Sequence, residues 1–110
     1  MSVPILIDEL FVEDYNIKIY TFTDKRRKAK IIINSINRTI DGSLLGLKLL
    51  DPSDKVFGNE GQIIYRIAIL FRNKGSHQDG STIYYNDRIV LFLKDKKNID
   101  KIKKLISKYK

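Results

Sequence analysis

The sequence predicts a mostly β domain that ends in a single α-helix. Short runs of β-branched and aromatic residues recur from residue 5 to residue 93, separated by polar or glycine-containing connections. From Asn98 onward the apolar residues follow the spacing of a helix instead. The chain has 110 residues, a length that suits one core, so we expect residues 1–110 to form a single domain.

The first two strands are expected at Ile5–Val12 and Ile17–Thr23. Between them, Glu13–Asn16 is a polar connection of hairpin length. In the second run, Ile17 and Ile19 alternate with less apolar residues, which is typical of a strand with one packed face. These runs therefore predict an antiparallel pair.

A third strand is expected at Ala29–Ile40, where Ile31 and Ile33 would face the core. Asp41 and Gly42 follow it directly, and this dipeptide favours a two-residue hairpin turn. The sequence therefore predicts one long strand that ends at this turn.

Leu44–Leu50 is the next apolar run, and its leucine content alone would also suit a helix. A run this short, between two turn signals, is not enough for a stable helix, so we expect a strand. Pro52–Gly61 is expected to be a polar loop. Gln62–Phe71 is rich in β-branched and aromatic residues and predicts the next strand.

The remaining β segments surround a glycine-containing loop at Arg72–Ser81. Strand-forming residues follow at Thr82–Tyr85 and Arg88–Leu93, with a break expected at Asn86 and Asp87. The sequence thus predicts about seven antiparallel strands before the helix.

The C-terminal helix is predicted to be amphipathic, with Asn98 as its N-cap. Lysines occupy its other faces, and an apolar helix face in water needs a partner to cover it. Strands followed by one such helix indicate a strongly bent sheet or open barrel capped by the helix, the pleckstrin-homology-like arrangement. The apolar face consists of Ile99, Ile102, Leu105, Ile106 and Tyr109.

Positive charge is concentrated in two segments of the chain. The formal net charge is +8, with five basic residues among the six positions Lys25–Lys30 and eight lysines against two aspartates in Lys94–Lys110. Such clustering favours a polyanionic partner, which could be a lipid headgroup, a nucleic acid or an acidic protein. The same charges also suit an ordinary solvated surface.

Several classes of site are excluded by composition. The chain has no cysteine and one histidine, so neither a disulfide framework nor a thiolate or histidine-rich metal site can form, and we expect no metal and no cofactor. No apolar run reaches the length of a membrane span, and the N-terminus lacks a signal-peptide pattern. We therefore expect a cytoplasmic protein.

Three stretches together resemble the GLUE domain, the split pleckstrin-homology-like module of an ESCRT-II subunit. They are Ile7–Tyr20, Ala29–Ile40 and Arg88–Lys110, which are similar to the opening strands, the third strand and the closing strand with its helix. The resemblance implies a module that binds ubiquitin, and in some members 3-phosphoinositides, in membrane-protein sorting. It also implies a location peripheral to membranes and contacts with other ESCRT subunits through regions outside this chain.

The resemblance implies that ubiquitin contacts the loop before the last strand and the C-terminal helix. Neighbouring tyrosines on one strand cannot both face the core, so one of them should be exposed, either as part of a binding patch or as an ordinary sheet residue. The candidate ubiquitin-binding residues are His77, Gln78, Asp79, Tyr84, Tyr85, Asn86, Ser107 and Lys108.

A second candidate site would bind an anionic membrane lipid. Arginine forks grip phosphate oxygens and lysines add point charge, although the same cluster also suits a solvated turn. The candidate anion-binding residues are Lys25, Arg26, Arg27, Lys28, Lys30, Arg72 and Lys74.

Catalysis finds little support in the sequence, so we expect a non-enzymatic protein. Asp8 and Glu9 are adjacent on a strand and should point to opposite faces, so they cannot act as a paired acid and base. Neither a glycine-rich phosphate loop nor a nucleophile motif is present. The alternative function is that of a small basic β-barrel that binds nucleic acid through exposed aromatic and basic side chains.

Overall fold

The computed structural model describes residues 3–24, 26, 29–49, 54–57 and 61–109. Within them the chain forms seven strands followed by one helix, which confirms the expected mostly β domain with a C-terminal helix. All of the strand pairs are antiparallel. The elements are β1 (Pro4–Val12), β2 (Tyr15–Phe22), β3 (Lys30–Asn34), β4 (Thr39–Leu49), β5 (Asp54–Phe57), β6 (Ile63–Ser76), β7 (Thr82–Leu93) and α1 (Lys96–Tyr109).

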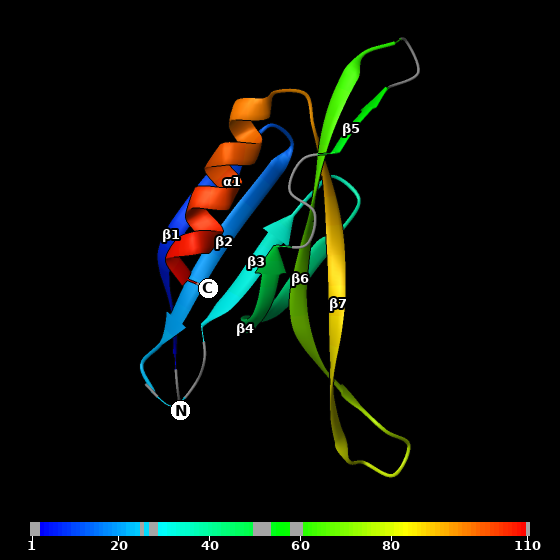
Figure 1. Cartoon of the computed structure of the whole chain (residues 1–110). Coiled ribbons are helices and arrows are strands. Elements are labelled where there is room, and N and C mark those ends of the chain that lie inside the picture. The colour runs from blue at the N-terminus through cyan, green and yellow to red at the C-terminus, as the bar shows by residue number, and fades with distance from the viewer. Residues whose placement is uncertain (1–2, 25, 27–28, 50–53, 58–60, 110) are drawn as a thin grey trace.

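The strands form one bent sheet in the order β1-β2-β3-β4-β6. The long strand β6 also pairs with β5 and β7; β7 runs along one of its edges, while β4 and β5 share the other. Figure 1 shows that β1, β2 and β3 run at an angle to β6 and β7. In the described part of the chain β1 and β7 do not pair with each other, so the strands form no closed barrel.

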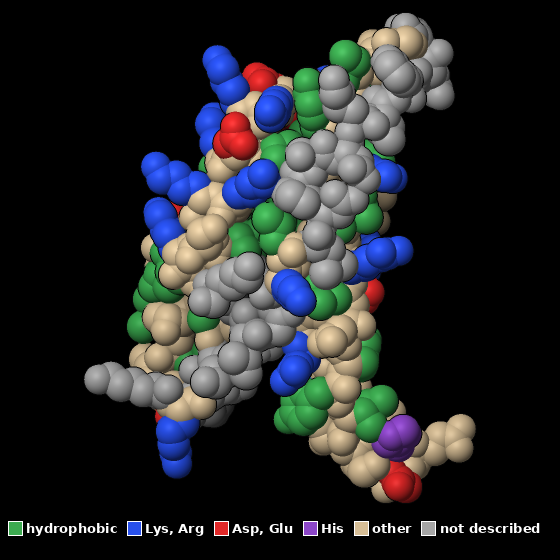
Figure 2. Space-filling view, viewed as in Figure 1, with side chains coloured by type: hydrophobic (Ala, Val, Ile, Leu, Met, Phe, Trp, Pro, Cys, Tyr) green, Lys and Arg blue, Asp and Glu red, His purple; other side chains and the backbone are tan. Residues whose placement is uncertain are grey.

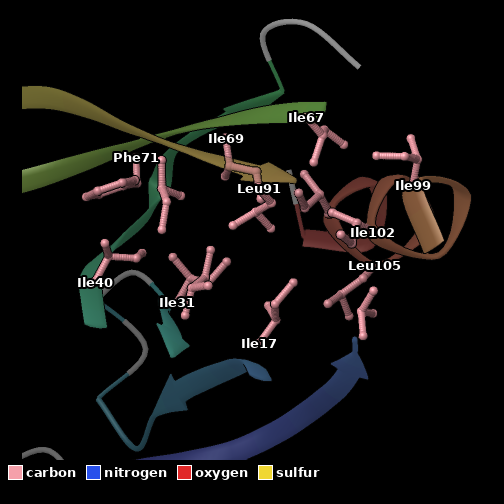
Figure 3. Close-up of a cluster of buried hydrophobic side chains, with 14 of the residues drawn as sticks. Ile17, Ile31, Ile40, Ile67, Ile69, Phe71, Leu91, Ile99, Ile102 and Leu105 are labelled. Atoms are coloured by element: carbon pink, nitrogen blue, oxygen red, sulfur yellow. The ribbon is translucent and has the colours of Figure 1, made fainter. Parts of the chain in front are cut away.

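The bent sheet and α1 enclose an aliphatic core (Figure 3). Ile17 and Ile19 of β2, like Ile31 and Ile33 of β3, are fully buried, as the alternation in the sequence predicts. The helix packs on the sheet and contacts β1, β4, β6 and β7. Its buried face consists of Ile99, Ile102, Leu105 and Ile106, which confirms the predicted apolar face.

Two contacts join the turn between β1 and β2 to the end of β7. The hydroxyl of Tyr15 accepts a hydrogen bond from the backbone N–H of Phe92 at 3.0 Å. The Glu13 carboxylate accepts from the backbone N–H groups of Lys94 at 2.9 Å and Asp95 at 3.4 Å. These bonds hold the two ends of the bent sheet close together at the point where the chain enters α1.

The N-cap of α1 is Asp95, so the prediction of Asn98 is wrong. The Asp95 carboxylate accepts a hydrogen bond from the Lys97 N–H at 2.9 Å, which is the capping geometry. Asn98 lies inside the first turn, and its side-chain amide donates to the Glu13 carboxylate at 2.9 Å. Two residues of capping type stand three positions apart, and the earlier one begins the helix.

The predicted single strand Ala29–Ile40 is in fact a hairpin. β3 ends at Asn34, where the N–H and hydroxyl of Ser35 both donate to the carbonyl of Arg38 at 2.8 Å. The hydroxyl of Thr39 then donates to the Asn34 side chain at 2.9 Å across the start of β4. These local bonds turn the chain within a segment that its isoleucines had marked as continuous strand.

Asp41 and Gly42 form no turn, contrary to the prediction, and lie within β4 opposite β3. Gly42 has a packing role instead, because a Cβ placed there would be 2.6 Å from Cδ2 of Phe71. β4 continues to Leu49, which confirms a strand over most of Leu44–Leu50; Leu50 is outside the described residues.

The segment Pro52–Gly61 was predicted to be a loop, yet residues 54–57 form the short strand β5. Asp54–Phe57 pairs with the beginning of β6 over four residues. An edge strand this short gives too weak a periodicity signal to be recognised among polar residues.

The loop predicted at Arg72–Ser81 and the break predicted at Asn86 and Asp87 are both wrong. β6 continues to Ser76, and β7 is continuous because Asn86 pairs with Arg72 and Asp87 with Phe71. Polar residues suggested loops here, but a two-stranded ribbon outside the core tolerates polar side chains on its exposed faces. The actual connection is short and comprises residues 77–81.

The last turn of α1 is attached to β1 by polar contacts around one carboxylate. The Tyr109 hydroxyl donates to Asp8 at 2.9 Å, and the Lys108 ammonium lies 3.5 Å from the same oxygen, Oδ2. The hydrogen bond from Tyr109 is the main cause that lowers the pKa of Asp8, and the same bond raises the pKa of Tyr109. The bond therefore favours ionised Asp8 and neutral Tyr109 in the folded state.

This contact should depend on pH at both ends of the scale. Because the pKa of Asp8 is lowered, its stabilisation is present above the ordinary carboxyl pKa and is lost as the pH falls through the folded-state value. Because the pKa of Tyr109 is raised, its contribution is present below about pH 10 and is lost at higher pH. In a carboxyl NMR titration, Tyr109→Phe should raise the pKa of Asp8 more than Lys108→Gln does. An unchanged Asp8 titration in Tyr109→Phe would contradict the assignment.

Candidate binding surface on the β6–β7 arm

The distal halves of β6 and β7 form a two-stranded ribbon that leaves the body of the protein (Figure 1). We define the β6–β7 arm as Arg72–Arg88, including the turn at residues 77–81. The core ends at Phe71 on β6 and Ile89 on β7, and no described residue of the arm belongs to it. A hairpin without a buried face is marginally stable by itself, so the arm adds little to the stability of the fold. The arm is therefore a candidate for a binding function.

The turn at the tip of the arm is held by its own hydrogen bonds. The His77 N–H donates to the Ser81 carbonyl at 2.9 Å, and Gly80 has the positive φ of 86° that suits glycine. The Asp79 carboxylate accepts from both the hydroxyl and the N–H of Ser81, at 2.6 and 2.9 Å. The bond from the Ser81 hydroxyl is the main cause that lowers the pKa of Asp79, and the bond from the Ser81 N–H adds to it. The tip therefore carries an ionised carboxylate at neutral pH.

One face of the arm continues the core face of the sheet and carries its apolar residues, and we call it the apolar face. The odd-numbered residues of β6 and β7 face the core in the body. In the arm they are Gly75, Ile83 and Tyr85, together with the polar residues Asn73 and Asp87. The Tyr85 ring lies against Gly75, where an added Cβ would be 3.2 Å from Cε1. Tyr85 is 46% exposed. Figure 2 shows hydrophobic side chains along the arm as far as its tip.

The opposite face of the arm is basic and carries a second tyrosine. Even-numbered residues place Arg72, Lys74 and Arg88 on this face, all exposed. Tyr84 is 67% exposed and pairs directly across the ribbon with Lys74, while Asn86 pairs with Arg72. Both tyrosines are thus exposed, where only one was expected, because the arm extends beyond the core that would have covered the other.

The helix residues of the predicted ubiquitin site do not join the arm. The hydroxyl of Ser107 donates to the Lys103 carbonyl at 2.7 Å, and Lys108 pairs with Asp8 on β1. In Figure 1 this end of α1 lies beside β1, while the tip of the arm extends away from it. The arm supplies the other candidates on one hairpin: His77, Gln78, Asp79, Tyr84, Tyr85 and Asn86.

The predicted anion-binding residues are separated in the same way. Arg26 is exposed and paired with Asp24, whose carboxylate lies 3.2 Å from Nε. Lys30 is 3.5 Å from Asp41 and lies over the Tyr20 ring at 5.6 Å. Arg72 and Lys74 lie on the arm, on its basic face. The candidates outside the described residues are Lys25, Arg27 and Lys28.

A shallow pocket of about 480 Å³ lies at the base of the arm. Three separate elements contribute to it: the β1–β2 turn through Asp14, the β3–β4 turn through Arg38, and β7 through Arg88. Arg38 is 3.6 Å from Asp87, so part of its charge is already compensated. The sequence could not reveal this pocket because its lining residues meet only after the sheet bends.

Asp8 and Glu9 are directed to different neighbours, as their adjacency predicts. Asp8 contacts Tyr109 of the helix, whereas Glu9 accepts from the Asn16 side chain at 3.0 Å. Among the residues that the structure describes, no three potential metal ligands form a group, and no helix is long and apolar enough to cross a membrane.

The comparisons with known proteins found no relative of this chain. Models of protein families, curated proteins and solved structures were all searched, and none gave a match.

Proposed function

We propose that this protein is a non-enzymatic recognition module of pleckstrin-homology-like architecture that binds ubiquitin in membrane-protein sorting, as part of an ESCRT-II-like complex. The order of seven strands and a C-terminal helix supports the architecture. Ubiquitin as the partner is supported by the resemblance of three stretches to the GLUE domain, namely Ile7–Tyr20, Ala29–Ile40 and Arg88–Lys110. The same proposal includes contact with an anionic membrane through the basic residues Lys25, Arg26, Arg27 and Lys28, which precede β3 in the sequence.

The observation that carries the ubiquitin proposal is the apolar face of the arm. Ile83 and Tyr85 lie together over Gly75, and the arm residues of this face include no lysine or arginine. Ubiquitin presents an apolar patch rimmed with basic residues, so a partner surface without positive charge avoids like-charge repulsion. The lysine-rich helix would meet that rim with like charge. The structure therefore favours the arm over the helix as the contact surface.

The interaction should be weak, because the apolar face of the arm is much smaller than a standard protein interface. We expect a dissociation constant of about 10⁻⁴ M. Titration of ubiquitin into the ¹⁵N-labelled protein should shift amide resonances of β6 and β7 in the arm. The double variant Tyr85→Ala, His77→Ala should abolish these shifts, since it removes the exposed ring of the apolar face and the single histidine of the chain, which lies at the tip.

Tyr84→Ala is the matched control, because it removes the neighbouring ring from the opposite face. It should leave the ubiquitin-induced shifts of the wild-type protein intact. If ubiquitin at about 1 mM, roughly ten times the expected dissociation constant, leaves every amide resonance unmoved, the proposal is wrong. Equal losses in the two tyrosine variants would also contradict an assignment to the apolar face.

A further inference from the structure

The basic face of the arm brings three cations and one exposed aromatic ring together. Arg72, Lys74 and Arg88 are exposed cations on two paired strands, and Tyr84 stands among them with 67% of its surface exposed. The ladder places Lys74 directly opposite Tyr84 and Arg72 on the diagonal. A flat aromatic ring is thus flanked by cations on a surface whose side chains do not pack in the core.

From this juxtaposition we propose that the basic face of the β6–β7 arm binds single-stranded nucleic acid. The bases stack on Tyr84, and Arg72, Lys74 and Arg88 contact the phosphates. Such surfaces combine a cationic track with aromatic platforms, and stacking is tolerant of sequence because every base has a π-face. We expect little sequence preference and a strong dependence on salt.

The spacing along the ribbon suits a strand that runs beside it. Residues two positions apart in a β-strand are separated by about 6.8 Å, which equals two steps of a stacked nucleic-acid strand at about 3.4 Å each. Arg72 and Lys74 are two positions apart on β6, and Arg88 continues the row on β7 toward the body. Successive cations can therefore follow every second phosphate.

The position of the charges favours nucleic acid over an anionic membrane. Because the arm projects from the body, its tip would contact a bilayer before its sides do. The tip contains His77, Gln78 and Asp79 and no lysine or arginine. Asp79 is held in hydrogen bonds that favour its ionised form. A negative tip with cations along the flank is unsuited to an anionic bilayer and suited to a polyanion that lies along the ribbon.

The test is fluorescence anisotropy with a labelled single strand of about 20 nucleotides and mixed sequence, at about 50 mM salt. Tyr84→Ala should weaken binding about 5- to 100-fold, whereas Tyr84→Phe should stay within about twofold of wild type because it keeps the ring. Lys74→Gln should reduce the slope of log K against log salt by about 0.7. Tyr85→Ala is the matched control on the other face and should bind like the wild type.

Each alternative site gives a different result. If Lys101→Gln, Lys104→Gln abolishes binding while Tyr84→Ala does not, the helix binds the oligonucleotide and the inference is wrong. Vesicles containing phosphatidylserine should not bind in a Tyr84-dependent way; if they do and the oligonucleotide fails to bind at about 100 μM protein, the surface recognises lipid and the inference is overturned. Unchanged thermal unfolding of Tyr84→Ala shows that its loss of binding is not a loss of fold, as expected for a residue outside the core.

The result is independent of the ubiquitin proposal, because the two sites lie on opposite faces of the ribbon. Tyr84→Ala should affect only the oligonucleotide and Tyr85→Ala only ubiquitin. Failure of one therefore leaves the other standing.

Discussion

Replacing Leu105 by alanine should lower the free energy of unfolding by about 2–5 kcal/mol, the range for a buried leucine that leaves a cavity. Leu105 is 5% exposed and lies on the face of α1 that covers the sheet. Figure 3 shows its side chain directed into the core with Ile102. Urea denaturation monitored by circular dichroism measures the loss, with an unchanged m-value as the sign of an intact two-state transition.

Lys104→Ala provides the control for this helix, because Lys104 is exposed on the neighbouring surface and alanine is a strong helix former. It should change the free energy of unfolding by less than about 0.5 kcal/mol. A loss of the same small size in Leu105→Ala would mean that the helix is not docked on the sheet.

Gly42→Ala should destabilise the protein by about 1–3 kcal/mol, although glycine is normally unfavourable inside a strand. The new Cβ would lie 2.6 Å from Cδ2 of Phe71 and 3.1 Å from its Cβ and Cγ. Phe71 is only 1% exposed, so its ring has no free space into which to move. A thermal or urea unfolding curve measures the effect.

A double-mutant cycle with Phe71→Leu identifies the cause. Because leucine lacks the ring, the cost of Gly42→Ala should fall in the Phe71→Leu background, and the difference gives the coupling between the two positions. If Gly42→Ala stabilises the protein, or costs the same in both backgrounds, the contact between β4 and the Phe71 ring does not explain the glycine.

The sequence predicted the packed faces well because buried residues recur at the repeat of the strand or helix that carries them. The alternation in β2 and β3 identified Ile17, Ile19, Ile31 and Ile33, all of which are buried. The helical spacing identified the buried face of α1 in the same way. These faces depend only on neighbours along the chain, so no knowledge of the bend in the sheet was needed.

Turns were predicted less well because their signals are local and ambiguous. Asp41 and Gly42 resemble a hairpin turn, but Gly42 is required by Phe71, a contact that only the pairing of β4 with β6 creates. The actual turn depends on bonds between Ser35 and Arg38, residue types that also occur in strands and loops. A glycine selected for packing and one selected for turning look alike in one sequence.

The sequence named residues of the arm as candidates but did not show how they are arranged, and their role stays a prediction. Tyr84 and Tyr85 were identified as candidates that could not both face the core, but the expected break after them concealed that β7 is continuous and that both rings lie beyond the core. Ser107 and Lys108 were grouped with them by resemblance, and the structure places Lys108 beside β1 instead. Separation of the arm into an apolar and a basic face required the register between β6 and β7.

The proposal that the arm is the binding surface is tested most directly by the tyrosine ring resonances in an aromatic ¹H–¹³C NMR spectrum. The chain has six tyrosines, which single tyrosine-to-phenylalanine variants can assign. Added ubiquitin should shift the Tyr85 ring and leave the Tyr84 ring in place, because the two side chains lie on opposite faces of the ribbon. Ubiquitin that shifts the Tyr109 ring at the end of α1 and neither arm tyrosine would contradict the proposal.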